Sequence, residues 1–301
     1  MSMEKQRLQI LEFVYKKYGQ KNGEIKTQIP SLTFYLEKKK TQNSNIQYEP
    51  SFCSILQGKK AVGFGNNLYT YEQNEYLLSS THLPAKVQII EASEEKPYLS
   101  YKIDFKLEDI YEVLKNTNPT NFKQNKKVEK GLFFDELNER LFDAIYRLIM
   151  LLDKPKEEID YLSSLIIKEL LFILINDKAG NFLSKFSMQS TISNKIVQVI
   201  SKIKENFTDK LNIKELADEV GISESSLYNN FKIVTQMTPI QFQKNLRLQE
   251  AKMLLSLQNI DVLTTSIMVG YESVSQFSKD YSKMYKMSPK KHANYLKTQN
   301  L

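Results

Sequence analysis

The apolar residues in the C-terminal third of the chain recur at helical spacing. Leu227 and Phe231 lie four residues apart, and Phe277 and Tyr281 repeat this spacing 50 positions later. Residues i and i+4 share one face of a helix, so each pair predicts a short helix with that face turned into a core. A further apolar stripe predicts a longer helix over residues 239–257, with Leu246, Met253, Leu254 and Leu257.

Capping signals mark the start of the two short helices, and they occur twice in the same order. Ser223 and Ser273 stand directly before the helices, where a side-chain oxygen accepts a hydrogen bond from the first turn. Gly221 and Gly270 lie just upstream, in the turn after a preceding short helix. The order of helix, glycine-containing turn and helix is typical of a helix-turn-helix motif. We therefore expect two copies of one such unit, each with its own task.

Residues 24–105 follow a different pattern. Short runs rich in β-branched and aromatic residues are separated by Gly, Asn and Pro, which is typical of strands and turns. Gly65–Asn67 predicts a hairpin turn, because Gly and Asn accept positive φ. Evenly spaced short strands favour a small β-barrel or a sandwich. A helix over about residues 3–18 is expected before them.

The middle of the chain predicts two helices with broad apolar faces, separated by Pro155. One face of this pair is expected to pack on the β domain, and another is available for a dimer partner. Residues 178–191 are interpreted as a linker.

Composition narrows the class of protein. An apolar fraction of 41% in 301 residues is sufficient for two cores, and the single cysteine, Cys53, fits a reducing cytosol. We interpret Cys53 as a small apolar core residue. The N-terminus is charged throughout, so no signal peptide is expected, and the most apolar run, residues 161–176, is too short to span a membrane. Of the net charge of +7, residues 190–301 contribute +5 (15 Lys and Arg against 10 Asp and Glu), which agrees with a polyanionic partner.

The second helix of a helix-turn-helix unit lies in the major groove of DNA. When the apolar pairs of the two short helices are turned inward, the outward positions hold small, amide and cationic side chains. Such side chains suit base edges, thymine methyl groups and phosphates. The predicted DNA-binding residues are Ser225, Tyr228, Asn229, Lys232, Val274, Ser275, Ser278 and Lys279.

A long C-terminal segment, about residues 194–296, resembles the DNA-binding domain of the AraC/XylS family of bacterial transcription regulators. The resemblance rests on "LADEVGISESSLYNNF" and on "VGYESVSQFSKDYSKMYKMSPKKH". It implies two helix-turn-helix units joined by one long helix, with both recognition helices in successive major grooves on one face of the DNA. The chain departs from the family pattern at Gln236 and Lys286, where Gly is usual, and at Asn229, where a basic residue is common.

The front half resembles the N-terminal domain of one subgroup of the same family, in a segment that begins "PSFCSILQGKKAVGFGNNLYTYEQ". The resemblance implies a cupin-like β-barrel with a helical dimerisation element. The expected fold class is α+β with two domains, the second being all-α with two helix-turn-helix units. The expected boundaries are 1–180 for the N-terminal sensor and dimerisation domain (barrel about 24–105, helices about 132–176), 181–191 for a linker and 192–301 for the AraC-type DNA-binding domain.

Alternation along the barrel strands turns some aromatic side chains inward, where they would line a ligand pocket. We predict Tyr35, Tyr76, His82 and Tyr101 as ligand-binding residues. A metal site needs several His and carboxylate ligands, and the two histidines, His82 and His292, fall in separate domains. We therefore expect no metal and no other cofactor. The barrel shows no nucleophile–base pair, so no catalytic residue and no enzyme activity are expected.

The leading hypothesis is a cytoplasmic, sequence-specific transcriptional regulator, an activator, that binds a bipartite site on double-stranded DNA. Its expected partners are a second copy in a homodimer, a small-molecule effector and, for an activator, RNA polymerase; no membrane association is expected. One alternative is a regulator whose N-terminal domain binds a protein partner or only dimerises. The other, from a different class, is a barrel enzyme with a DNA-tethering tail.

Overall fold

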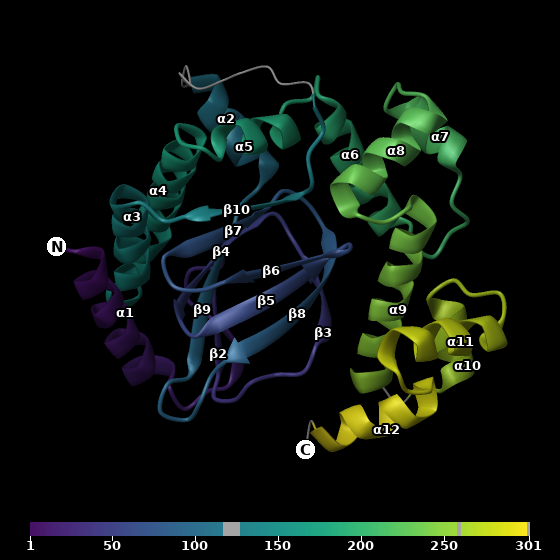
Figure 1. The fold of residues 1–301 in the computed structure, drawn as a ribbon, viewed down its shortest axis with the longest axis horizontal. Coiled ribbons are helices and arrows are strands. Elements are labelled where there is room, and N and C mark those ends of the chain that lie inside the picture. Colours follow the sequence, from purple (N-terminus) through teal and green to yellow (C-terminus); the bar gives the residue numbers. More distant parts are fainter. Residues whose placement is uncertain (117–126, 258–259, 300–301) are drawn as a thin grey trace. The chain divides into compact units, whose positions relative to one another are not determined.

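The computed structural model describes residues 1–116, 127–257 and 260–299 and is shown in Figure 1. The chain divides into two compact units, Met1–Lys195 and Ile196–Leu301, which we call the N-terminal unit and the C-terminal unit. The division falls inside one helix, at 196 rather than at the expected 192.

Antiparallel strands form the centre of the N-terminal unit. The larger sheet has six strands in the order β1-β2-β9-β4-β7-β10, and the smaller has four in the order β3-β8-β5-β6. The strands of the larger sheet are β1 (Gly23–Lys26), β2 (Leu32–Glu37), β4 (Ser51–Gln57), β7 (Glu75–Ser79), β9 (Tyr98–Asp104) and β10 (Leu132–Glu136). Those of the smaller sheet are β3 (Ser44–Tyr48), β5 (Lys59–Phe64), β6 (Asn67–Tyr71) and β8 (Leu83–Glu91).

The predicted α+β class is confirmed, with one correction to the barrel. Within the described residues, no strand ladder joins an edge of the larger sheet to an edge of the smaller one. The domain is therefore a pair of sheets with open edges and not a closed barrel. The predicted hairpin between β5 and β6 is confirmed: Phe64 pairs with Asn67, and Gly65 in the turn has a φ of 61°.

The two faces of the larger sheet have different neighbours, because successive residues of a strand point to opposite sides. Phe34 of β2 packs against Tyr18 of a helix, at 6.0 Å between ring centroids, and Tyr101 is its register partner on β9. These two rings therefore lie on the face covered by helices. Ser100 and Lys102 point to the opposite face, towards the smaller sheet.

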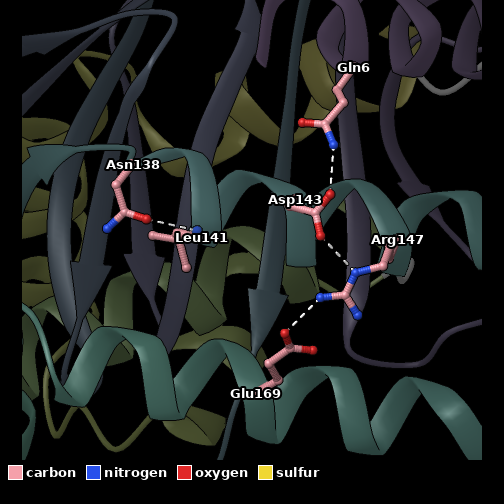
Figure 2. A network of polar contacts seen from close by, with 6 residues as sticks. All are labelled: Gln6, Asn138, Leu141, Asp143, Arg147 and Glu169. Atoms are coloured by element: carbon pink, nitrogen blue, oxygen red, sulfur yellow. Dashed lines mark hydrogen bonds and ion pairs between the residues drawn. The ribbon is translucent and has the colours of Figure 1, made fainter. Parts of the chain in front are cut away.

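Helices of the N-terminal unit cover the larger sheet. They are α1 (Met3–Tyr18), α2 (Leu107–Asn116), α3 (Glu139–Met150), the short 3-10 helix η1 (Leu151–Asp153), α4 (Lys156–Ile175) and α5 (Gly180–Ser187). A polar network links three of them (Figure 2): Gln6 of α1 donates to Asp143 of α3 at 2.8 Å, and Arg147 of α3 bonds both Asp143 (2.9 Å) and Glu169 of α4 (2.7 Å). Asn138 caps α3 by accepting from the backbone NH of Leu141 at 2.8 Å.

Two segments differ from the sequence-based expectation. The helices were expected from about residue 132, but Leu132–Glu136 is strand β10, paired with β7. The segment is the edge strand of the larger sheet. Its aromatic side chains favour this position, because Phe134 stacks on Tyr69 of the smaller sheet at 4.7 Å between ring centroids.

The expected linker at 181–191 contains a helix instead. Phe182 and Phe186 of α5 are buried and lie 5.0 Å apart, and Phe182 packs on Phe133 of β10 at 5.4 Å. The rings form an i, i+4 apolar pair in a segment that also holds Ser184, Lys185 and Ser187, and these polar residues made it resemble a linker.

The C-terminal unit is helical. Its helices are α6 (Ile192–Glu205), α7 (Ile213–Glu219), α8 (Glu224–Thr235), α9 (Pro239–Leu257), α10 (Val262–Met268), α11 (Val274–Tyr285) and α12 (Pro289–Gln299). In the stripe predicted for α9, Leu246 and Leu254 are buried, whereas Met253 is 45% exposed. The side chain of Leu257 lies outside the described residues.

Candidate nucleic-acid interface and ligand cavity

The first candidate reading helix is α8. The Ser223 hydroxyl accepts from the backbone NH of Ser226 at 3.2 Å, so the predicted cap is in place and sets the start of the helix. Leu227 and Phe231 are fully buried. Four predicted residues consequently lie on the exposed face: Ser225, Tyr228, Asn229 and Lys232.

The second candidate reading helix, α11, is built in the same way. Ser273 accepts from the backbone NH of Gln276 at 3.4 Å, and Phe277 and Tyr281 are fully buried. Of the predicted residues, Ser275 and Lys279 are exposed and Val274 and Ser278 are half-buried. Each reading helix thus presents polar and cationic groups outward, as its apolar pattern predicted.

Left-handed backbone sets both turns of the helix-turn-helix units. Gly221 has a φ of 63° and Gly270 a φ of 83°. At Gly270 an added Cβ would lie 2.2 Å from the carbonyl oxygen of Thr208, so both the φ and the close approach require glycine. Gln236 and Lys286, where the family usually has Gly, adopt φ values of 61° and 60°. These two residues, at the C-terminal ends of α8 and α11, therefore adopt the left-handed backbone that glycine favours.

Arg247 of α9 is a residue that the pattern of apolar positions did not reveal. Its Nε donates to the carbonyl oxygen of Phe207 and its Nη1 to that of Gly270, both at 2.7 Å. Its Nη2 donates to the carbonyls of Thr208 and Asp209 at 2.9 Å. Because the guanidinium has several donors in a fixed plane, one side chain joins the loop after α6 to the turn of the second unit.

An ion pair also joins α9 to the second reading helix. Lys244 lies 3.1 Å from Asp280 of α11, which accepts from Gln276 at 3.0 Å. Burial tends to raise the pKa of Asp280, but the hydrogen bonds from Gln276 and Lys244 outweigh it and lower that pKa. The carboxylate thus stays charged and holds α11 against α9.

A separate cavity of about 520 Å³ lies in the N-terminal unit, with walls from both sheets. Of the four residues predicted to bind a ligand, Tyr35 lines the cavity from the face of the larger sheet that is turned to the smaller one. Tyr101 also borders the cavity, although its ring lies on the opposite, helix-covered face. Tyr76 does not: its ring stacks on Phe52 at 5.0 Å, on the helix-covered side of the sheet. His82 is not part of the wall either, and its Nδ1 lies 3.9 Å from Glu49 Oε1.

Cys53 is buried and lines the same cavity, and burial raises the pKa of its thiol. Within the described parts of the chain, no group of three or more His, Cys, Asp or Glu side chains is placed to hold a metal ion. Over the same residues, no helix is both long and apolar enough to cross a membrane.

Comparison with known proteins places the chain in a family. The model of the AraC-type transcriptional regulator N-terminus matches residues 28–182, and a model of a helix-turn-helix domain matches residues 216–294. The first match alone covers half of the chain. The protein therefore belongs to the AraC family of transcriptional regulators.

Individual relatives match parts of the chain. The regulator CdhR of Pseudomonas aeruginosa is 34% identical over 95 residues, which are 32% of this chain and 28% of CdhR. The lactose operon transcription activator of Staphylococcus xylosus is 26% identical over 159 residues, or 52% of this chain and 57% of the activator. The chain thus spans less than two thirds of the length of these relatives.

The fold is shared with ToxT of Vibrio cholerae over most of the chain. A ligand-free structure of a ToxT point variant has a TM-score of 0.57 at 11% identity, covering 92% of this chain and 100% of that one. Wild-type ToxT bound to an unsaturated fatty acid has a TM-score of 0.54 at 12% identity, covering 87% of this chain and 94% of that one.

Proposed function

We propose that this protein is a cytoplasmic, sequence-specific transcription activator that reads DNA with α8 and α11. The observation that carries the proposal is the repeated construction of these two helices: each has a serine cap, a buried apolar pair and an exposed polar face. Helices of this kind place polar side chains against base edges in the major groove. With two reading helices per chain, the binding site is bipartite, with halves about 10 bp apart.

The eight outward residues have different tasks in this proposal. Lys232 and Lys279 contact phosphates, which supply affinity that depends on salt. Amide and hydroxyl groups discriminate between base pairs, so the residues that meet base edges are Ser225, Asn229, Ser275 and Ser278. Tyr228 is 40% exposed and Val274 half-buried, so they make apolar contacts such as those to thymine methyl groups.

The N-terminal unit is proposed to bind a small effector and a second copy of the chain. The cavity between the sheets supports the effector, because its volume is in the range of small-molecule sites. On α4, the apolar side chains of Tyr161 (72%), Leu162 (37%) and Leu165 (50%) are exposed and adjacent at helical spacing. Such a patch on a helix of the N-terminal unit supports homodimerisation, and the activator would then contact RNA polymerase as a dimer on DNA.

The alternatives have less support. If the N-terminal domain bound only a protein, we would expect aromatic side chains to fill the space between the two sheets. These sheets instead enclose a cavity. The family to which the chain belongs consists of transcriptional regulators, so we propose no enzyme activity.

Selective capture of genomic DNA tests the proposal. The full-length chain is incubated near physiological salt with sheared DNA from its own genome, and the retained fragments are sequenced. We expect a small set of fragments that share a bipartite motif, and we expect a variant with Asn229→Ala and Ser275→Ala to lose the selection. A variant with Lys156→Ala, which removes a charge from exposed α4, serves as the control. Selection that survives in the Asn229 and Ser275 variant would contradict the assignment of these helices.

A further inference from the structure

The cavity between the two sheets has a charged group at its wall. Lys60 of β5 lies directly opposite Tyr71 of β6 and Ile89 of β8, so the three side chains share the face that lines the cavity. Lys60 Nζ lies 5.8 Å from the centroid of the Tyr48 ring of β3. Tyr98 contributes to the wall from β9 of the other sheet. The wall of the cavity therefore combines one lysine with phenol side chains from both sheets.

Lys60 differs from its neighbours in having no counter-ion. Lys59 pairs with Glu72 at 3.4 Å and Lys102 pairs with Asp104 at 3.0 Å. Among the residues that the structure describes, no carboxylate lies within ion-pair distance of Lys60. Burial lowers the pKa of Lys60, which means that the surroundings by themselves disfavour the positive charge. A half-buried cation of this kind is stabilised when an anion binds beside it.

Three tyrosines that border the cavity have a hydroxyl with no hydrogen-bond partner in the described residues, Tyr48, Tyr98 and Tyr101. The ring of Tyr101 lies on the helix-covered face, which leaves two of these hydroxyls on the cavity side. They belong to Tyr48, which is 4% exposed, and to Tyr98, which is 1% exposed. Ser100 lies near enough to act on the pKa of Tyr98, but the two side chains do not form a hydrogen bond. Buried hydroxyls are nearly always paired, so these two point to a ligand that accepts hydrogen bonds.

We propose that the cavity binds a small organic monocarboxylate, whose carboxylate group is received by Lys60 Nζ and by the hydroxyls of Tyr48 and Tyr98. This inference rests on the proposed role of the cavity as an effector site. Charge-assisted hydrogen bonds from one ammonium and two phenols match the acceptor capacity of one carboxylate.

The rest of the wall selects the body of the ligand. Ile46, Val87 and Ile89 form an apolar part of the lining, which suits a hydrocarbon or aromatic body. Glu24, Glu37 and Glu49 also line the cavity, and they repel a dianion about twice as strongly as a monoanion. A dianion such as phosphate is therefore disfavoured against a monocarboxylate.

Calorimetric titration of the full-length chain tests this inference. The probe is 3-phenylpropanoate, and 3-phenylpropanamide is its neutral counterpart of nearly the same shape. We expect the acid to bind and the amide to bind at least about tenfold more weakly, because a hydrogen bond to a charged group is worth about that factor. Lys60→Met should lower the affinity for the acid by about tenfold or more. Lys59→Met is the control, because Lys59 pairs with Glu72, and it should leave that affinity unchanged.

A second variant separates a binding role from loss of folding. Tyr98→Phe removes a hydroxyl that has no partner, so the free protein keeps its stability while the acid binds several-fold more weakly. Equal affinity for acid and amide, an unchanged affinity in Lys60→Met, or tighter binding of inorganic phosphate would overturn the inference. So would the absence of binding by acetate, benzoate and 3-phenylpropanoate at millimolar concentration.

Genomic DNA capture by the same preparations separates this inference from the function on which it rests. If the protein captures DNA selectively but does not bind carboxylates, only the proposed ligand class is overturned. Failure of selective capture, with or without the acid, overturns the proposed function itself.

Discussion

Single residues in the C-terminal unit are proposed to have two kinds of task, contact with DNA and support of a tight turn. Lys279 lies on the exposed face of α11, whereas Gly270 is closed in against Thr208. Substitutions at these positions should therefore change different quantities, the affinity for DNA at the first and the free energy of unfolding at the second.

We expect Lys279→Ala to weaken DNA binding on all sequences to a similar degree. A variant with one phosphate contact fewer releases one counter-ion fewer when it binds DNA. The slope of log affinity against log salt concentration should therefore fall in magnitude by about 1. A salt titration of binding to a captured fragment measures this, with Lys156→Ala as the matched control. An unchanged slope in Lys279→Ala would exclude its contact with phosphate.

At Gly270, replacement by Ala should destabilise the C-terminal unit by about 2–3 kcal/mol, because the φ of 83° and the close carbonyl of Thr208 both oppose a Cβ. Lys286→Gly is the converse change: it relieves a residue held at a φ of 60° and should stabilise by about 0.5–1 kcal/mol. Urea unfolding of the two variants measures both. The same sign of change in both would show that backbone conformation does not control these turns.

At the scale of the element, α9 and α12 decide how the second helix-turn-helix unit is held. Arg247 of α9 reaches four backbone carbonyl oxygens, and His292 of α12 lies 3.1 Å from the Tyr281 hydroxyl of α11. These contacts lie away from the predicted reading residues, so their loss should act through the position of α11.

Arg247→Lys should destabilise the C-terminal unit by about 2–3 kcal/mol, because lysine keeps the charge but cannot reach several carbonyls in one plane. The spacing of the two reading helices should then become less defined, and affinity for the complete bipartite site should fall more than affinity for one half-site. Urea unfolding and binding to the two DNA lengths measure this. Arg247→Lys with the stability and affinity of the original protein would exclude the positioning role.

His292 makes the stability of the C-terminal unit depend on pH. Burial, and then the charge of Lys252, lower the pKa of His292 from its usual 6.5. The unfolded chain therefore binds the proton more readily, so the free energy of unfolding decreases as pH falls through 6.5 towards the lowered pKa of the folded state. Above 6.5 this contribution is constant. We expect His292→Gln to show a smaller loss of stability between neutral and mildly acidic pH in urea unfolding, and an equal loss in both proteins would refute this role.

At the scale of the whole molecule, the exposed apolar patch of α4 is the feature that we propose to bring two chains together. Leu165→Lys places a charge in the patch and should convert the dimer into a monomer in sedimentation experiments. Leu8→Lys is the matched control, since Leu8 is 54% exposed but lies on α1 outside the patch. The monomeric variant should bind one bipartite site normally and lose the extra affinity for two adjacent sites. Unchanged sedimentation of Leu165→Lys would rule out this face as the dimer interface.

The repeated helix-turn-helix pattern was predictable from sequence because its signals are local. A serine cap, an apolar pair four residues apart and a glycine in the turn act within a few residues of each other, and Leu227 and Phe231 are buried as that pattern required. The exposed positions of α8 followed directly from the buried ones. Their contacts with DNA remain predictions.

Long-range contacts account for what the sequence did not reveal. The strand at Phe134 and the helix at Phe182 depend on aromatic partners far along the chain, so local patterns pointed to a helix and a linker instead. Tyr76 was a reasonable pocket residue by composition, but the register of β7 turns its ring to the helix-covered face. A shift of one position in strand register would reverse that outcome, and register is set between strands.

The sequence by itself determined the family, the two-unit order and the amphipathic design of both reading helices, because these depend on residue types at fixed short spacing. Only the tertiary structure decided that Arg247 joins a loop to the second turn and that the two sheets stay open. It also decided that Lys60, Tyr48 and Tyr98 line one cavity. Each of these brings together groups from separate elements, and their proximity depends on how the strands and helices pack rather than on their distance along the chain.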